Sequence, residues 1–191
     1  MVGVGVDPCQ SRKMFHRRAI ASDPAVVADI ALDAARLEVI AQRLRELARA
    51  ETIDQRESTL LAPVIETLRG RFPAMTLQTS GALDSAVGMS AENTLIVFSH
   101  HADNARHHHA KTLRLSVIPD DAGVLVEVSN DGDPISAQNS DRIFDAFFTT
   151  RCDSGGTGLA IARSVMTSRG GSIALRPAAD RVTFELSFPA G

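Results

Sequence analysis

Two alternating apolar runs joined by a short turn limit what this chain can fold into. The runs are Thr112–Ile118 and Val124–Ser129, and the residues 119–123 between them include the proline, aspartates and glycine typical of a turn. Alternation with a period of two places the apolar side chains of a strand on one face. The pair therefore predicts a hairpin with one buried face, and a second layer must cover that face.

Helical and extended segments surround this hairpin without a regular alternation. We expect helices over Thr59–Arg71, Ser90–Ala110, Asp141–Phe148 and Leu159–Arg169. We expect strands over Met75–Ser80, Ser172–Arg176 and Arg181–Phe188, a turn over Asn130–Pro134 and a glycine-rich loop over Cys152–Gly158. This order favours one layer of helices on a largely antiparallel or mixed sheet.

The first quarter of the chain has a different pattern. Asp23-Pro24 is a good helix start, with Asp at the N-cap and Pro at the first helical position. From there to Glu51, apolar residues recur at steps of three and four and form a narrow seam. The pattern fits either a helix facing the protein's own core or a helix that pairs with a second copy.

Composition excludes several classes of protein. The 191 residues are 44% hydrophobic and 23% charged with a formal net charge of −3, as in ordinary globular proteins. A nucleic-acid-binding protein would normally carry a basic surplus, so we expect no nucleic-acid partner. No apolar run approaches the roughly 20 residues of a membrane span. The two cysteines, Cys9 and Cys152, do not suggest a disulfide framework, so we expect a cytoplasmic protein.

Four segments carry side chains or glycines suited to a phosphorylated ligand. They are His100–Ala105, Val128–Ile135, Arg142–Arg151 and Gly155–Ala162. Asn104 brings a neutral amide oxygen, a usable ligand for Mg²⁺. On a helix, Asn104 shares one face with His100 and His108, four residues away on either side. The glycines of the last segment open a helix and let backbone N–H groups approach an anion.

Together and in this order, the four segments resemble the nucleotide-binding boxes of GHKL ATPases, specifically the catalytic domain of bacterial sensor histidine kinases. The most specific strings are RIFDAFFTTR, GGTGLAIARSV and the RGGSI that follows. The resemblance covers Thr59–Pro189, while Asp23–Glu51 resembles the second helix of the family's dimerisation domain. It implies an α+β fold, a two-layer α/β sandwich whose mixed sheet is covered by helices, with an N-terminal bundle-type helical arm. We expect a partial dimerisation region at 1–56 and an ATP-binding domain at 57–191.

The resemblance also implies ATP and Mg²⁺ as cofactors and a role for each matching residue. Asn104 matches the asparagine that coordinates Mg²⁺, and Asp103 lies where an acidic residue often precedes it near the γ-phosphate. We expect these two to be the catalytic residues. His107 and His108 match positions facing the phosphates and the adenine, and Asn130 matches an aspartate that reads the adenine amino group. The residues expected to bind the nucleotide are Asn104, His107, His108, Asn130, Gly132, Ile135, Phe147, Gly156, Thr157, Gly158 and Leu159.

The chain departs from the family's pattern at several of these positions. His100 stands where the first asparagine belongs, and an imidazole favours a softer metal than Mg²⁺. The expected metal-binding residues are therefore Asn104 and His100. Asn130 lacks the charge of an aspartate, Pro134 replaces a glycine, and the string GTGLAIA is two residues shorter than usual. The five histidines from His100 to His109 also fit a solvated helix face without function.

A histidine kinase needs an acceptor imidazole, and His16 is the candidate ahead of the Asp23–Glu51 helix. Its neighbours do not match the acidic, proline-followed context that the resemblance predicts, and it lies close to the expected turn at Ser22–Pro24. The alternative is an exposed polar residue beside basic ones. We therefore expect either a fragment without its acceptor helix or a kinase whose acceptor lies on another protein.

The leading hypothesis is a two-component sensor histidine kinase core that passes the γ-phosphoryl group of ATP to a histidine. Its expected partners are a response regulator receiver domain and a second copy bound through the N-terminal helix. Contact with a membrane would come only through a missing or separate sensor region. The alternative is a degenerate, non-catalytic dimeric adaptor that docks a response regulator. A serine kinase of the anti-sigma type is a third possibility, although such proteins do not usually carry the Asp23–Glu51 helix.

Overall fold

The computed structural model describes residues 57–150, 156–176 and 181–191, together with Ala41. The chain divides into two compact units, Met1–Ala41 and Gln42–Gly191, and the fold given below is that of the second unit. Apart from Ala41, the helix expected over 23–51 lies outside the described residues, as do His16 and Cys152.

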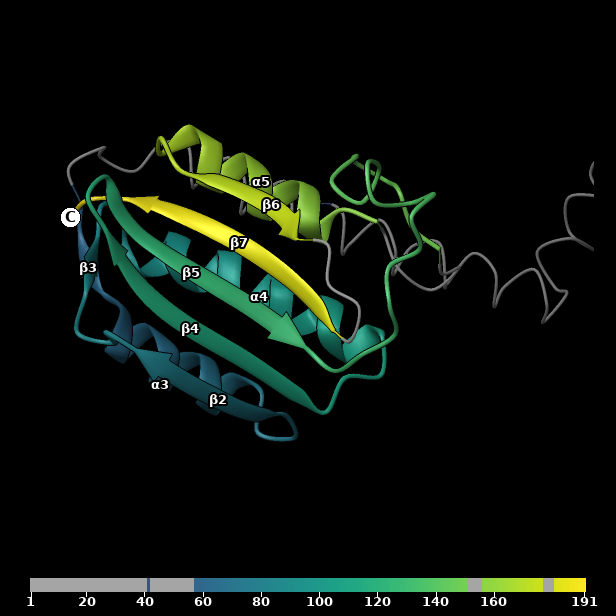
Figure 1. The fold of residues 1–191 in the computed structure, drawn as a ribbon, viewed down its shortest axis with the longest axis horizontal. Helices are drawn as coiled ribbons and strands as arrows, with labels where there is room; N and C mark the ends of the chain where they lie inside the picture. Colours follow the sequence, from purple (N-terminus) through teal and green to yellow (C-terminus); the bar gives the residue numbers. More distant parts are fainter. Residues whose placement is uncertain (1–40, 42–56, 151–155, 177–180) are drawn as a thin grey trace, which may run out of the picture. The chain divides into compact units, whose positions relative to one another are not determined.

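A five-stranded mixed sheet forms one layer, with strand order β2-β4-β5-β7-β6 (Figure 1). The strands β2 and β4 are parallel, and the other neighbours are antiparallel. Their bounds are β2 Thr76–Gly81, β4 Thr112–Asp120, β5 Gly123–Asn130, β6 Ser172–Arg176 and β7 Val182–Pro189. The predicted β4–β5 hairpin and the closing β6–β7 hairpin are confirmed.

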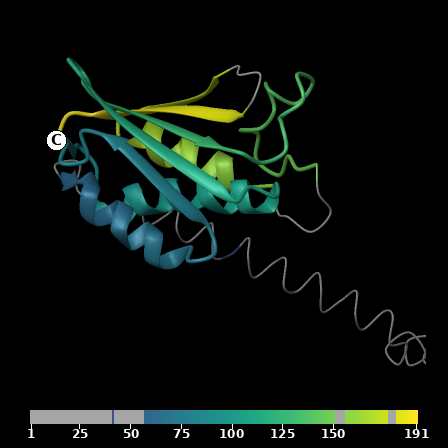
Figure 2. The same ribbon diagram turned by 60° about the horizontal axis from the view of Figure 1, so that its bottom comes forward.

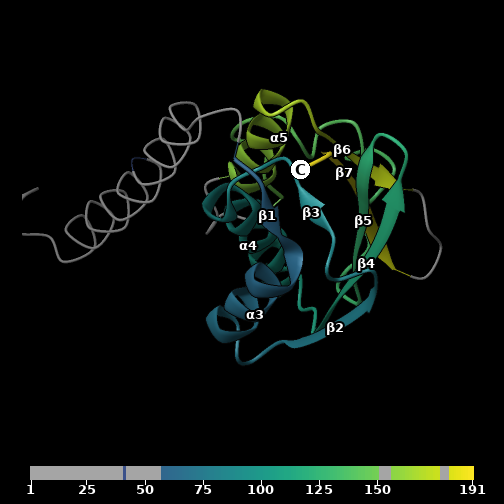
Figure 3. The ribbon, with the colours of Figure 1, turned by 90° about the vertical axis from the view of Figure 1, so that its left-hand side faces the viewer.

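Three helices form the second layer and cover one face of the sheet (Figures 2 and 3). They are α3 Leu61–Arg71, α4 Ala91–His107 and α5 Gly158–Ser168. The two-layer α+β architecture with a mixed sheet is therefore confirmed. No helix in the described part of the chain is long and apolar enough to cross a membrane.

The core lies between the two layers. Along β5, and along β4 as far as Val117, every second side chain is buried, as the alternating pattern predicts, and these side chains face the helices. The helices contribute a matching apolar stripe, exemplified by Leu61, Val64, Ile65 and Leu68 of α3. On β7, Phe188 packs edge-on against Phe98 of α4, with ring centroids 5.9 Å apart, and joins the sheet to this helix.

Several sequence predictions are corrected at the ends of elements. Thr59–Leu60 is not helical and forms a short strand, β1, that pairs with β3 at Ala86–Val87, and neither strand was expected. Helix α4 ends at His107 rather than near Ala110. His109 adopts a positive φ of 63°, and the Ala110 N–H returns to the Ala105 carbonyl, which closes the helix.

The helix predicted over Asp141–Phe148 is wrong. This stretch is a series of overlapping turns, in which the N–H groups of Arg142, Asp145 and Phe148 each donate to a carbonyl three residues back. Phe147 has a φ of 68°, which a right-handed helix cannot contain. Phe144 packs against the core while Phe147 is exposed, although residues three apart would share one face of a helix.

Candidate functional site

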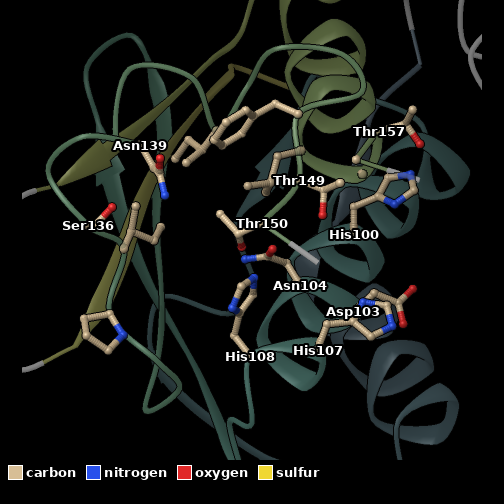
Figure 4. Close-up of a pocket in the computed structure, with 17 residues that line it drawn as sticks. His100, Asp103, Asn104, His107, His108, Ser136, Asn139, Thr149, Thr150 and Thr157 are labelled. Atoms are coloured by element: carbon tan, nitrogen blue, oxygen red, sulfur yellow. The ribbon is translucent and has the colours of Figure 1, made fainter. Parts of the chain in front are cut away.

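A cavity of about 200 Å³ lies between the second half of α4, the turn segment after β5 and the start of α5. Figure 4 shows its lining side chains, contributed by parts of the sequence that are far apart. The lining residues are His100, Asp103, Asn104, His107, His108, Pro134, Ile135, Ser136, Asn139, Ile143, Phe148, Thr149, Thr150, Gly156, Thr157, Gly158 and Leu159. Most of the residues singled out from the sequence are among them.

Helix α4 supplies the polar wall. Ser90 caps its N-terminus by accepting a hydrogen bond from the Asn93 N–H, at 3.2 Å. This start sets the helical phase in which His100, Asn104 and His108 follow one another on the side that lines the cavity. The predicted shared face of these three residues is therefore confirmed. His100 is buried, with 7% of its surface exposed.

The start of α5 supplies a backbone wall. Gly156 has a φ of 59°, and a Cβ at this position would lie 2.6 Å from the carbonyl carbon of Phe147 and from the carbonyl oxygen of Phe148. Glycine is therefore required where this loop passes the preceding turn. The first turn of α5 holds no acidic residue. The first N–H groups of a helix have no partner within the helix, and with the positive end of its dipole they suit an anion.

The turn segment after β5 forms the third wall. Ser136 and Asn139 lie across the cavity from the α4 residues Asp103 and Asn104 (Figure 4). Together with Thr149 and Thr150, they are lining residues that sequence reasoning did not select. The two threonines belong to the string RIFDAFFTTR, which the sequence analysis singled out. Nothing in the sequence indicated which side chains of this string line the cavity.

Three residues predicted to bind the nucleotide do not line the cavity. Asn130 is only 2% exposed, and its Oδ1 accepts the Gly132 N–H at 3.0 Å. A Cβ on Gly132 would lie 2.5 Å from the His108 carbonyl oxygen, so this glycine lets the turn approach the end of α4. Phe147 is 63% exposed, while its neighbour Phe148 lines the cavity beneath the Arg142 guanidinium.

Asp131, which the sequence analysis passed over, secures this turn to the sheet. Its Oδ1 accepts the backbone N–H groups of Lys111 and Thr112, each at 2.9 Å. The hydrogen bond from Thr112 is the largest cause that lowers the pKa of Asp131, because it favours the charged carboxylate. Asp131 therefore holds the end of β5 against the start of β4, beside the cavity.

His101 lies outside the cavity although it stands between two cavity-facing turns of α4. Its ring is buried against Phe184 of β7 with centroids 4.7 Å apart. Neither ring nitrogen has a hydrogen-bond partner in the part of the chain that the structure describes. Burial, and to a smaller degree the charge of His100, lowers the pKa of His101 to about 3, so its ring is neutral in the folded protein.

The described cavity wall holds few fixed charges. Asp103 is its carboxylate, the histidines 100, 107 and 108 are its ionisable bases, and neither lysine nor arginine is among the described lining residues. Within the described ranges, no three His, Cys, Asp or Glu side chains come together in a way that could hold a metal ion. A metal ion here would need ligands from a bound molecule or water.

Residues 91–191 match the model of the family described as Histidine kinase-, DNA gyrase B-, and HSP90-like ATPase. The chain belongs to this family. A stretch of 52 residues is 38% identical to the sensor histidine kinase ZraS of Escherichia coli (strain K12). That stretch is 27% of this chain and 11% of the length of ZraS.

Solved histidine kinase structures share the fold of this ATPase domain. The catalytic domain of histidine kinase ThkA matches 70% of this chain and 94% of that domain, with a TM-score of 0.63 and 22% identity. The Acinetobacter baumannii histidine kinase AdeS matches 96% of this chain and 95% of that structure, with a TM-score of 0.67 and 16% identity. Full-length ShkA in complex with AMPPNP matches 81% of this chain and 37% of its own, with a TM-score of 0.60 and 21% identity.

Proposed function

We propose that this chain binds ATP with Mg²⁺ in the cavity between α4 and α5 and transfers the γ-phosphoryl group to a histidine. One observation carries the proposal: a single cavity brings the amide and carboxylate of α4 to the glycine-rich N-terminus of α5. The ATPase family supports the choice of nucleotide. In phosphoryl transfer, positioning and charge neutralisation supply most of the catalysis; the cavity wall offers the positioning, and the N-terminus of α5 and Mg²⁺ would supply the charge neutralisation.

Each wall of the cavity has a role in this proposal. The N–H groups of Gly156, Thr157, Gly158 and Leu159 bind the phosphates, as helix N-termini do. The imidazoles of His107 and His108 contact the phosphates and the adenine respectively. Ile135 provides an apolar surface for the base. Three further residues lie outside the cavity lining and shape the turns beside it. They are Asn130, Gly132 and Phe147.

Asp103 and Asn104 are the proposed catalytic residues. Asp103 lies on the cavity wall, where its carboxylate can orient the acceptor imidazole beside the γ-phosphate. The amide oxygen of Asn104 fits Mg²⁺, which accepts few protein ligands and keeps water and phosphate oxygens. Bound Mg²⁺ neutralises phosphate charge, and Asn104 with His100 would hold it there.

Calorimetry with ADP and a non-hydrolysable ATP analogue tests this proposal. We expect binding in the presence of Mg²⁺ and at least a tenfold loss of affinity, about 1.4 kcal/mol, in the Asn104→Ala variant. Glu92→Ala, an exposed position on the same helix, is the matched control and should bind like the parent. Absence of a heat signal at millimolar nucleotide, with Asn104→Ala indistinguishable from the parent, would refute the proposal.

The donor set at α4 also predicts a metal preference. If the imidazole of His100 enters the coordination shell, Mn²⁺ should support ADP binding better than Mg²⁺, because imidazole prefers the softer ion. Calorimetry of ADP with each ion, for the parent and for His100→Asn, measures the preference. We expect the variant to lose it. Equal ADP affinity with both ions in the parent would place His100 outside the shell.

The wider signalling role follows the same proposal. The phosphoryl group would pass to a response regulator receiver domain, and a second copy would bind through the helix expected over 23–51. We place the protein in the cytoplasm, where ATP and a receiver domain are available. The matched stretch covers only 11% of ZraS, so these partners are proposed for this chain independently of that protein.

Two observations favour a non-catalytic adaptor as the second candidate. The cavity of about 200 Å³ is smaller than the roughly 300 Å³ of most small-ligand pockets, and Asn130 lies off its wall. Incubation with radiolabelled ATP and a supplied acceptor domain separates the two candidates. Phosphorylation of the acceptor rejects the adaptor, and binding of a receiver domain without phosphorylation supports it.

A further inference from the structure

A second cavity, of about 380 Å³, lies where the end of α3 passes α4. Helices α3 and α4 lie side by side in the helical layer (Figures 2 and 3). Four of its lining residues, Arg71, Pro73, Ala74 and Arg106, are exposed, so it is an open hollow on the surface. The residues that line it are Arg71, Phe72, Pro73, Ala74, Met75, Asp103, Arg106 and Ala110.

The chemistry of this wall suits an anion attached to an apolar group. It carries two guanidinium groups, from Arg71 and Arg106, against the single carboxylate of Asp103. One N–H of Arg71 donates to the Ser99 hydroxyl at 3.4 Å, and a guanidinium has five such donors in a fixed fork. Phe72 packs against the core from a half-buried position, and beside the arginines it offers an apolar surface.

Arg106 connects this second cavity to the first. Its Nη2 lies 3.0 Å from Asp103 Oδ1 and 3.2 Å from His107 Nε2. Asp103 lines both cavities, and His107 lines the first. The side chains of Arg106 and Asp103 are 56% and 36% exposed, so water screens their ion pair. Such a pair contributes little, and the guanidinium can exchange Asp103 for another anion at small cost.

We propose that the second cavity binds a small organic anion, a carboxylate or phosphate monoester on an apolar group. Arg71 and Arg106 hold the anion, and Phe72 and Met75 contact the apolar part. A bound anion draws Arg106 away from Asp103 and leaves that carboxylate uncompensated in the first cavity. An anion bound in the second cavity therefore weakens nucleotide binding in the first. This coupling rests on the proposed function, whereas the anion site itself does not.

Titration with phenyl phosphate, followed through the ¹³C-labelled methyl group of Met75, tests the site in the full chain. We expect a saturable shift of the Met75 signal, at least a fivefold weaker response in Arg71→Gln and Arg106→Gln, and no saturable shift with phenol. Arg114→Gln, on the sheet, is the control and should respond like the parent. A Met75 signal that does not shift with phenyl phosphate would contradict the proposed site. An undiminished shift in both Arg71→Gln and Arg106→Gln would contradict it as well.

Calorimetry of ADP with Mg²⁺, with and without saturating phenyl phosphate, tests the coupling. We expect a roughly two- to fivefold loss of ADP affinity, the range for an exposed ion pair. The Arg71→Gln variant should bind ADP normally, and phenyl phosphate should no longer weaken that binding. If phenyl phosphate weakens ADP binding equally in this variant, it competes directly in the first cavity, and the coupling is overturned. If ADP does not bind at all, the proposed function fails while the Met75 titration still decides whether the second site exists.

Discussion

His101 and His100 are neighbours in sequence and have opposite surroundings. The ring of His100 lines the cavity, whereas His101 packs against Phe184 in the core. A buried imidazole without a hydrogen-bond partner is costly, and protonation would add the cost of a buried charge. Placing this histidine inside the core therefore makes the stability of the fold depend on pH.

The direction of this dependence follows from the two pKa values of His101. Its pKa is about 3 in the folded protein and about 6.5 in the unfolded chain, so only the unfolded chain binds the proton between these values. The free energy of unfolding must fall as pH decreases below about 6.5, by about 2 kcal/mol at about pH 5. Urea unfolding at about pH 7 and about pH 5 measures this loss.

The His101→Leu variant isolates the effect of this side chain. We expect it to remove most of the loss between the two pH values, since leucine has no proton to bind. His109→Gln is the matched control, because the His109 side chain is 74% exposed and water screens its pair with Asp133. Equal pH dependence in the parent and in His101→Leu would contradict the argument.

At the scale of elements, the turn after β5 is fitted closely to the end of α4. The Asp133 N–H donates to the His108 carbonyl at 2.8 Å, and Gly132 leaves no room for a side chain beside that carbonyl. The turn thereby holds His108, which lines the first cavity. Contact between these two elements, rather than either alone, shapes that wall.

Two glycine substitutions test this fit. Gly132→Ala should lower the free energy of unfolding by about 1–3 kcal/mol, the usual cost of overpacking, because its Cβ would lie 2.5 Å from the His108 carbonyl oxygen. Gly70→Ala, in α3 with open space around the new Cβ, should raise it by about 0.5–1 kcal/mol. Urea unfolding compares the two. Equal midpoints for Gly132→Ala and the parent would show that the turn does not press on α4.

At the scale of the whole molecule, the sheet and the helical layer that covers it are built from residues in the later part of the chain. The buried hydrophobic residues of the described core run from Leu61 to Phe188. A domain of this size buries most of its unfolded surface and is able to fold alone. The predicted boundary at residue 57 leaves all of these core residues on one side.

A protein truncated to residues 57–191 tests this boundary. We expect one cooperative thermal transition and an ADP affinity within about twofold of that of the full chain, because the core and the cavity wall lie inside this range. Circular dichroism and calorimetry measure the two quantities. Loss of the cooperative transition would place residues before 57 inside the folding unit.

Local patterns were enough to predict most helices and strands of the second unit. The β4–β5 alternation and the glycines before α5 act over a few residues, so their structural consequences can be read along the chain. The turns over Asp141–Phe148 could not be predicted in this way. Their helix-like spacing is overridden by the left-handed backbone of Phe147 and by the packing of Phe144 against Phe184, 6.2 Å away across the fold.

The candidate site also has features that local sequence predicts and features that it does not. The sequence by itself determined the α+β class, the shared face of His100, Asn104 and His108, and the glycine-rich start of α5, because each depends on backbone periodicity or on a missing side chain. Only the tertiary structure decided that His101 enters the core, that Asn130 lies off the cavity wall, and that Asp103 borders two cavities. These depend on which elements pack together, and that packing joins residues far apart in the chain.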